Sequence, residues 1–226
     1  AESVLSAAAM VTIPRLAFLW GKKRFKDFNQ VLVNVTNMLG ILVLPASIGL
    51  IMLSHEVVVI IASDKYLPAV NSLRIISWAI IFSIFAWIFS YCVLIPTKRE
   101  KAVLKNTIIT AIENVILNII FIPTMSYDGT ALSTVIAELS MLILNAYSCY
   151  DILKPVLFQK QTLMNLWESI IGCIGIVIVC VLCNLFWQSL ILKTVLSIIL
   201  SVIIYVAILV LFNNKIAIDF LNKIYM

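Results

Sequence analysis

The chain contains six long stretches of almost unbroken apolar sequence, and each is long enough to cross a lipid bilayer. A helix of about 20 apolar residues spans the hydrocarbon core, and apolar residues make up 63% of the 226 positions. Inside a bilayer every backbone polar group must be hydrogen-bonded within its own segment, so spans of this length are predicted to be helices. The fold class is therefore predicted to be an all-α polytopic transmembrane bundle. The predicted spans are residues 31–54, 70–96, 104–124, 129–150, 163–187 and 189–212.

The basic residues predict the orientation of these spans. Cytoplasmic loops are enriched in Lys and Arg. Of the sixteen basic residues, thirteen fall in alternate loops that would share one side, and three would lie on the other: Lys65, Arg74 and Lys193. The net charge of +5 follows from this topology and from contact with anionic lipid headgroups, so it requires no nucleic-acid partner. The expected cytoplasmic segments are residues 21–27, 98–102, 154–161 and the C-terminus, and the expected outer segments are 55–66 and 125–128.

The start of the chain is expected to continue a helix that comes from outside. Residues 4–13 are apolar but too short to span, and a basic cluster follows them. A signal peptide would carry its positive charge before the apolar run instead. We therefore expect residues 1–14 to be the inner part of a helix and the chain to be the C-terminal part of a longer membrane protein. Residues 14–29 mix aromatic and basic side chains, which is typical of an interfacial segment or of a cytoplasmic loop.

Two of the predicted spans carry polar side chains along one side each. Polar groups inside a membrane are costly and are functional candidates by default. The alternative is that they bond to one another between helices, and for the Asn and Thr residues the two interpretations stay open. For Glu113 and Glu138 a functional role is favoured, because an unpaired buried carboxylate tends to take up a proton. The polar positions are Asn106, Thr107, Thr110, Glu113, Asn114 and Asn118 in the third span, and Thr130, Thr134, Glu138, Asn145 and Ser148 in the fourth.

No pattern in the chain indicates a catalytic, metal or cofactor site. Cys180 and Cys183 form a C-x-x-C motif, but it lies inside an apolar span with no His nearby, where redox or zinc chemistry is not expected. His55 is the only histidine and lacks the partners of a metal site. We therefore predict no cofactor, no metal and no enzymatic activity.

Five stretches carry a resemblance to a known family: LPASIGLIMLS, DKYLPAV, IPTKREK, AIENVILNIIFIP and YDGTALSTVIAE. In order and spacing they resemble the C-terminal half of the polysaccharide flippases of the Wzx type. These belong to the multidrug/oligosaccharidyl-lipid/polysaccharide exporter superfamily, which also holds lipid II flippases and multidrug and toxin extruders. The resemblance covers residues 13–138, and after residue 155 only the hydropathy agrees. One departure is Ser63, where the family usually has a glycine.

The resemblance implies one lobe of a two-lobe exporter in the bacterial cytoplasmic membrane, with a central cavity that opens alternately to each side. The cargo would be a polyprenyl-diphosphate-linked oligosaccharide, driven in some members by a proton or sodium gradient. Membrane lipids and a glycan polymerase machinery are the further partners considered. Neutral groups would bind the sugars, Arg74 and Lys105 are the candidates for the diphosphate or are plain interfacial residues, and Glu113 and Glu138 would couple to the ion. The neutral candidates are Asn106, Thr110, Asn114, Asn118 and Thr134.

Four other functions compete with that of a polysaccharide flippase. A multidrug extruder or a lipid II flippase of the same superfamily would share the fold. A membrane-embedded glycan-assembly enzyme would need a sizeable outer loop with clustered acidic, Arg or His residues, and the outer loops here are short. A scaffold subunit without transport activity stays open as well.

Overall fold

The computed structural model describes residues 2–214 and 216–218, with side chains from Thr12 onward. Within this part of the chain every regular element is helical, so the all-α prediction is confirmed. Five helices are long and apolar enough to cross a membrane. The predicted cytoplasmic C-terminus, with Lys215 and Lys223, lies outside the described residues. The elements are α1 (Glu2–Gly21), α2 (Phe25–Met52), α3 (Ser54–Ala62), the 3-10 turn η1 (Asp64–Tyr66), α4 (Ala69–Trp87), the π-helical η2 (Ile88–Leu94), α5 (Glu100–Ser148), α6 (Tyr150–Leu157), α7 (Lys160–Phe186) and α8 (Leu190–Leu211).

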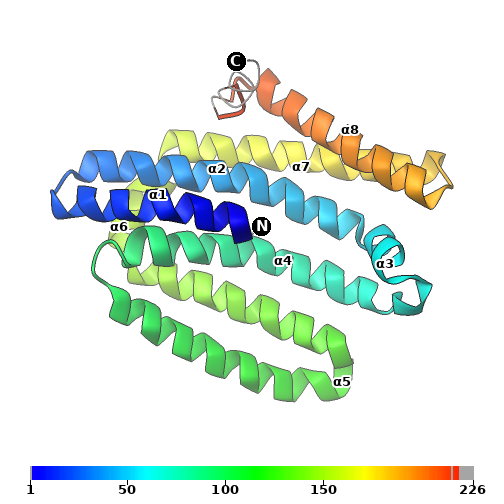
Figure 1. Cartoon of the computed structure of the whole chain (residues 1–226), viewed down its shortest axis with the longest axis horizontal. Helices are drawn as coiled ribbons and strands as arrows, with labels where there is room; N and C mark the ends of the chain where they lie inside the picture. The colour runs from blue at the N-terminus through cyan, green and yellow to red at the C-terminus, as the bar shows by residue number, and fades with distance from the viewer. Residues whose placement is uncertain (1, 215, 219–226) are drawn as a thin grey trace.

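Helix α5 is a hairpin of two helical arms rather than one straight helix. Its 49 residues reverse direction at Ser126, whose φ of 51° and ψ of −126° are not helical. Gly129 allows the reversal, because a Cβ there would lie 2.6 Å from the carbonyl oxygen of Phe121. We call residues 100–125 the first arm and residues 127–148 the second arm. Counted with both arms, six long helices occupy the regions that the apolar stretches predicted (Figure 1).

The helices lie in layers that follow the order of their contacts. Helices α7 and α8 form one side, α2 packs between α7 and α4, and α5 covers the other face of α4 (Figure 1). Helix α1 packs on α2 and on η2. The short helices α3 and α6 lie at opposite ends of the bundle (Figure 1). These ends are called the α3 end, predicted to be outside, and the α6 end, predicted to be cytoplasmic.

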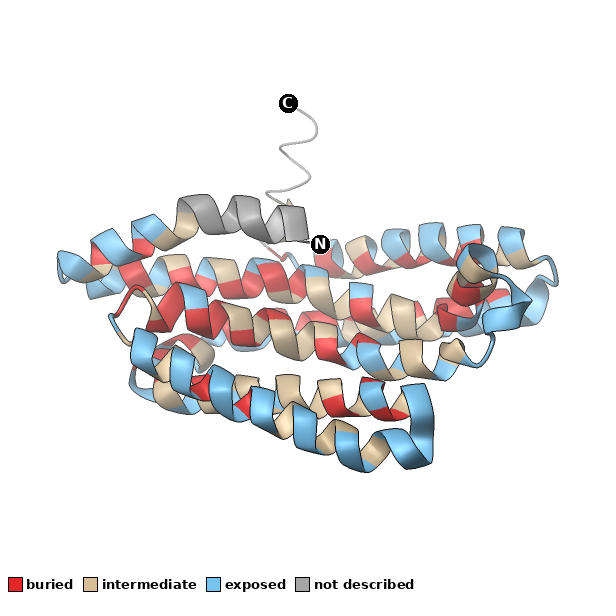
Figure 2. Ribbon diagram, turned by 60° about the horizontal axis from the view of Figure 1, so that its bottom comes forward, coloured by how far each residue is buried: buried red, intermediate tan, exposed pale blue. Residues whose placement is uncertain are grey.

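The core lies in the middle layers, near the α6 end. Buried residues from α1, α2, η2 and α6 meet there, and Phe28, Leu94 and Leu153 are almost fully enclosed. A second cluster joins α2 to α7 and α8. In it the hydroxyl of Tyr205 donates to the carbonyl oxygen of Ile41 at 2.7 Å. Figure 2 shows the buried residues gathered in the middle of the bundle, whereas the first arm of α5 is mostly exposed.

For residues 14–29 the sequence left an interfacial segment and a plain loop open, and the structure excludes the plain loop, because these residues are mostly helical. Helix α1 continues through Pro14 to Gly21, and α2 begins at Phe25 after a short turn. The physical reason is burial: Leu16, Leu19 and Phe28 are buried in the core, and apolar residues three apart share one face of a helix. Helix α6 was not predicted either, and it too inserts buried apolar residues into the core.

Candidate functional site

The polar side of the first α5 arm faces the second arm. Asn106 donates from Nδ2 to Asn145 Oδ1 at 2.9 Å and to Ser148 Oγ at 3.1 Å. Nearer the turn, Ser133 Oγ donates to Asn118 Oδ1 at 2.8 Å, and Asn118 Nδ2 donates to Asn114 Oδ1 at 2.9 Å. Hydrogen bonds of this kind hold membrane helices together. Asn106 and Asn118 therefore connect the two arms, as the interhelical interpretation expects.

The remaining polar candidates of the hairpin differ in whether they have partners. Thr110 and Thr134 donate to carbonyl oxygens one turn earlier in their own arms, at 3.1 and 2.9 Å. Glu113 Oε1 accepts a hydrogen bond of 2.9 Å from Ser140 Oγ. Glu138 is half-buried and has no hydrogen bond or ion pair to any described residue. The two carboxylates, which the sequence treats alike, are thus in different chemical situations.

Asn145 links the hairpin to α4. It is fully buried, and its Nδ2 donates to Ser90 Oγ at 2.7 Å and to the carbonyl oxygen of Ala86 at 3.3 Å. The second of these bonds reaches a carbonyl two residues before the π-helical segment η2. Sequence reasoning missed the partners Ser90, Ser133 and Ser140. Single serines in apolar helices show no pattern by themselves, and only the neighbouring helix reveals what they bind.

The other side of the first arm is apolar and exposed. An apolar face of this kind suits the bilayer interior. Its residues, all at least half exposed, are Ile108, Ile112, Val115, Ile116, Ile119 and Ile120.

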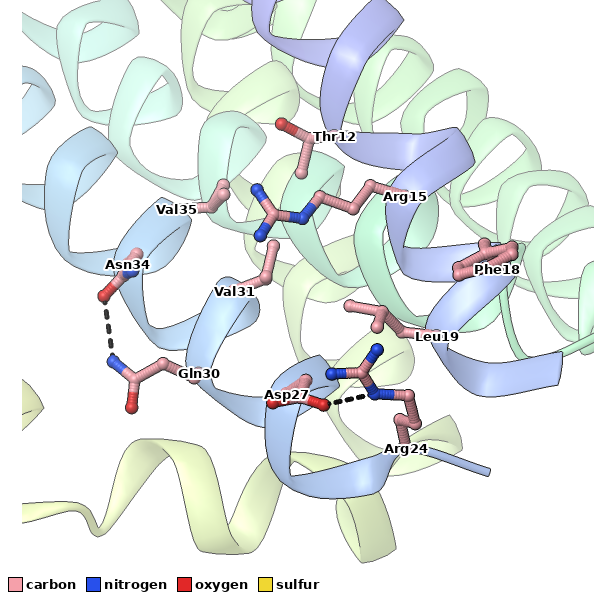
Figure 3. A pocket seen from close by; sticks show the side chains of 10 residues that line it. All are labelled: Thr12, Arg15, Phe18, Leu19, Arg24, Asp27, Gln30, Val31, Asn34 and Val35. Atoms are coloured by element: carbon pink, nitrogen blue, oxygen red, sulfur yellow. Dashed lines mark hydrogen bonds and ion pairs between the residues drawn. The ribbon is translucent and has the colours of Figure 1, made fainter. Parts of the chain in front are cut away.

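A cavity of about 520 Å³ lies between α1 and α2. We call it the α1–α2 cavity. Figure 3 shows the Arg15 side chain extending from α1 toward α2, with the ion pair of Arg24 and Asp27 beside it. The walls combine apolar side chains with neutral hydrogen-bonding groups. The lining residues are Thr12, Arg15, Phe18, Leu19, Arg24, Asp27, Gln30, Val31, Asn34 and Val35.

The charge of the α1–α2 cavity is positive. Arg24 Nε lies 2.6 Å from Asp27 Oδ2, so these two charges offset each other. Arg15 forms no ion pair with any described side chain, which leaves one uncompensated guanidinium. A guanidinium presents five N–H donors in a planar fork that matches phosphate and carboxylate oxygens. The cavity can therefore receive an anionic group, with Gln30 and Asn34, themselves joined by a 3.1 Å hydrogen bond, offering neutral contacts beside it.

The two cations that the sequence singled out lie at opposite ends of the bundle. Arg74, in the first turns of α4 near the α3 end, lines a second cavity there. Its Nε donates to Ser54 Oγ at 2.8 Å. Lys105 is exposed near the start of the first α5 arm. Arg15 was counted only as a topology signal, although it lines the α1–α2 cavity and, unlike Arg24, has no ion pair with a described residue. Only the packing of α1 on α2 distinguishes it from its basic neighbours.

A family model described as "Lipid II flippase MurJ" matches residues 4–206. The chain belongs to this family. The MurJ family is one of transporters rather than enzymes, which at the level of the family confirms that no catalytic activity is expected. The match also confirms the exporter superfamily. Within this superfamily the match is to the lipid II flippases and not to the polysaccharide flippases of the Wzx type. The lipid II flippase was the alternative in the sequence analysis.

A solved structure has the same fold. The structure of "Lipid II flippase MurJ, inward closed conformation" superposes with a TM-score of 0.73 and 18% sequence identity over 92% of this chain. The chain spans 44% of the length of that protein. At this identity the likeness shows the fold alone. No curated protein sequence matches the chain.

Proposed function

We propose that the protein flips a polyprenyl-diphosphate-linked glycan precursor of the lipid II type across the bacterial cytoplasmic membrane by alternating access. Membership of the MurJ family supports the transport of a lipid-linked precursor, and supports lipid II over an O-antigen or capsule unit. The coverage of 44% of the solved relative supports a role as one lobe of a larger exporter. The orientation remains the predicted one, with the α6 end and the C-terminus in the cytoplasm.

The observation that carries this proposal is the unpaired Arg15 in the α1–α2 cavity. A diphosphate head group needs cations, and the guanidinium of Arg15 can bind it through charge-assisted hydrogen bonds. Thr12, Gln30 and Asn34 line the same cavity and can bind sugar hydroxyls. The apolar side chains Val31 and Val35 lower the local dielectric, which strengthens such contacts. In the predicted orientation the cavity lies where a precursor from the cytoplasmic leaflet would enter.

For ion coupling, Glu138 is the better of the two carboxylate candidates. A carboxylate that exchanges a proton or binds a cation during a cycle must be free of permanent partners. Glu138 has none among the described residues, whereas Glu113 accepts a hydrogen bond from Ser140. Substrate binding by Asn106, Asn114 and Asn118 would require their hydrogen bonds within the hairpin to open. We therefore place the first contact with the head group at the α1–α2 cavity.

The proposal is tested by replacing Arg15 with Gln in cells that depend on this protein for lipid II transport. Loss of one charge-assisted contact is expected to reduce flipping by roughly tenfold or more. Flipping is measured as the fraction of lipid II that becomes accessible to an externally added modifying enzyme. Arg15→Lys should retain part of the activity, because it keeps the charge but not the planar fork.

The matched control is Lys26→Gln. Lys26 is an exposed basic residue on the same turn-and-helix segment, but it does not line the cavity. The Lys26→Gln variant should flip lipid II as fast as the unmodified protein when both are present in the membrane in equal amounts. Normal flipping by Arg15→Gln would remove the cavity from the mechanism. Rescue of an O-antigen flippase-null strain without rescue of a lipid II flippase-depleted strain would return the cargo to a polysaccharide unit.

A further inference from the structure

A second cavity, of about 410 Å³, lies at the α3 end, where side chains from α3, α4, α7 and α8 converge. We call it the α3-end cavity. Two cationic side chains, Arg74 and Lys193, line it together with a single carboxylate, Glu56, and His55 lies beside them. Asn184 adds a neutral group. These residues come from four separate helices, so only the tertiary structure assembles them.

Each charged group in this cavity is held in place by a neighbour. Lys193 Nζ lies 2.7 Å from Glu56 Oε1 and donates to Asn184 Oδ1 at 2.8 Å. The side chains of Glu56 and Lys193 are only 9% and 15% exposed, so solvent screens the pair little. Arg74 donates from Nε to Ser54 Oγ, and its two terminal nitrogens make no hydrogen bond to any described residue. Arg74, which lines the cavity, thus keeps N–H donors available for a ligand.

The basic residues of this cavity lie on the predicted outer side, although most basic residues of the chain lie on the predicted cytoplasmic side. Only three basic residues fall on the predicted outer side, namely Lys65, Arg74 and Lys193, and two of them line this one cavity. Glu56 offsets Lys193, which leaves the charge of Arg74 uncompensated. Arg74 is itself exposed, so its guanidinium is accessible to a ligand and can form charge-assisted hydrogen bonds with an anion. The arrangement therefore suits an anionic ligand.

The rim of the cavity indicates that this ligand is a lipid. Val181 and Leu185 of α7 line the cavity and are 45% and 73% exposed, so apolar surface continues from the cavity along α7. A lipid can place its phosphate at Arg74 and lay its acyl chains on this surface. A free anion would gain nothing from the apolar rim.

We propose that the α3-end cavity binds the phosphate of a lipid in the adjacent leaflet, with Arg74 as its ligand, while Lys193 stays paired with Glu56. Arginine binds phosphate oxygens with two parallel hydrogen bonds. This site is separate from the α1–α2 cavity, which lies at the opposite end of the bundle. Failure of the flippase assay would leave this proposal untouched, because lipid binding is measured without transport.

The test uses the full purified protein in detergent micelles and three probes. Dioctanoyl-phosphatidylglycerol carries the phosphate, dioctanoylglycerol lacks it, and inorganic phosphate lacks the chains. Titration calorimetry is expected to show binding of the first only. Arg74→Gln should weaken that binding by roughly tenfold or more, the size expected for one charge-assisted hydrogen bond. Arg74→Lys should fall between the two.

Two further variants keep the proposal falsifiable. Lys65→Gln removes the third outer basic residue, which is exposed and does not line the cavity, and it should bind the lipid as the unmodified protein does. Equal losses for Lys65→Gln and Arg74→Gln would show general surface attraction and overturn the site. The paired variant Glu56→Gln/Lys193→Gln preserves the charge balance and should still bind through Arg74. Binding of inorganic phosphate as tightly as the lipid would overturn the lipid assignment.

Discussion

The α5 hairpin and the α1–α2 cavity are both rich in polar side chains, but they use them in opposite ways. In the hairpin, Asn106 and Asn118 bond to groups on the facing arm. In the cavity, Arg15 has no described ionic partner and lines open space of about 520 Å³. A polar stripe inside a membrane helix therefore does not by itself indicate a binding site. What separates structural from functional polar groups is whether a neighbouring helix already satisfies them.

From this comparison we expect substitution of Asn145 to destabilise the protein more than substitution of any other hairpin residue. Asn145→Leu would remove three hydrogen bonds, leaving Ser90 without this buried partner and Asn106 with only its bond to Ser148. We expect the free energy of unfolding to fall by about 2 kcal/mol, since each bond between membrane helices contributes roughly 0.6 kcal/mol and buried groups left unpaired add to the loss. The measurement is reversible unfolding in mixed detergent micelles.

The matched variant for this comparison is Asn34→Leu in the α1–α2 cavity. Asn34 is exposed and bonds only to Gln30 among the described side chains, so stability should change by less than about 0.5 kcal/mol. Flipping should be the property that suffers. If both variants lost the same stability, the distinction between the two regions would fail.

The second way to sharpen the comparison lies inside the hairpin. Glu138→Gln should lower gradient-driven flipping by about tenfold, equivalent to about 1.4 kcal/mol, because it removes the charge of the unpartnered carboxylate. Glu113→Gln should change flipping less than about twofold, since an amide oxygen can still accept the hydrogen bond of Ser140. Flipping would be followed in vesicles with and without an imposed proton or sodium gradient. A larger loss of flipping in Glu113→Gln than in Glu138→Gln would make Glu113 the coupling residue. Normal flipping rates in both variants would show that neither carboxylate couples to an ion.

The smallest effect is expected where a polar contact between helices lies in solvent. Arg99 binds Asp151 of α6 through two hydrogen bonds, at 2.8 and 2.6 Å. The hydrogen bond from Arg99 lowers the pKa of Asp151. The side chains are 35% and 60% exposed, so the pair should contribute only about 0.5 kcal/mol.

The direction of its pH dependence follows from the lowered pKa. The carboxylate is favoured in the folded state, so the contribution is fully present above the unfolded pKa of about 3.9 and disappears as the pH falls through the folded value. Asp151→Asn should therefore be slightly less stable at pH 7 and as stable as the unmodified protein well below pH 4. If Asp151→Asn lost more stability at pH 7 than Asn145→Leu, the exposed ion pair would be more important for stability than the buried hydrogen bonds, contrary to our expectation. Thermal unfolding at both pH values measures this.

Part of the candidate site was accessible from the sequence because the relevant signals are local. Four polar residues of the third predicted span are spaced four residues apart, which places them on one side of a helix, and the structure has them there: Asn106, Thr110, Asn114 and Asn118. Arg74 and Lys105 were selected because they are basic residues near the ends of predicted spans. Arg15 was not, because five basic residues precede the first predicted span and nothing local distinguishes one from another.

Hydropathy alone determined that this chain is a helical membrane protein, because the bilayer leaves the backbone of an apolar span no alternative to internal hydrogen bonding. The turn at 123–129 was also predictable, since proline, aspartate and glycine occur together between two apolar runs. Only the tertiary structure decided what each polar group contacts. Asn106 meets Asn145, Lys193 meets Glu56 and Arg15 meets open space, and these differences depend on side chains tens of residues apart. The period of a helix specifies a face, but the partner of that face is specified by packing.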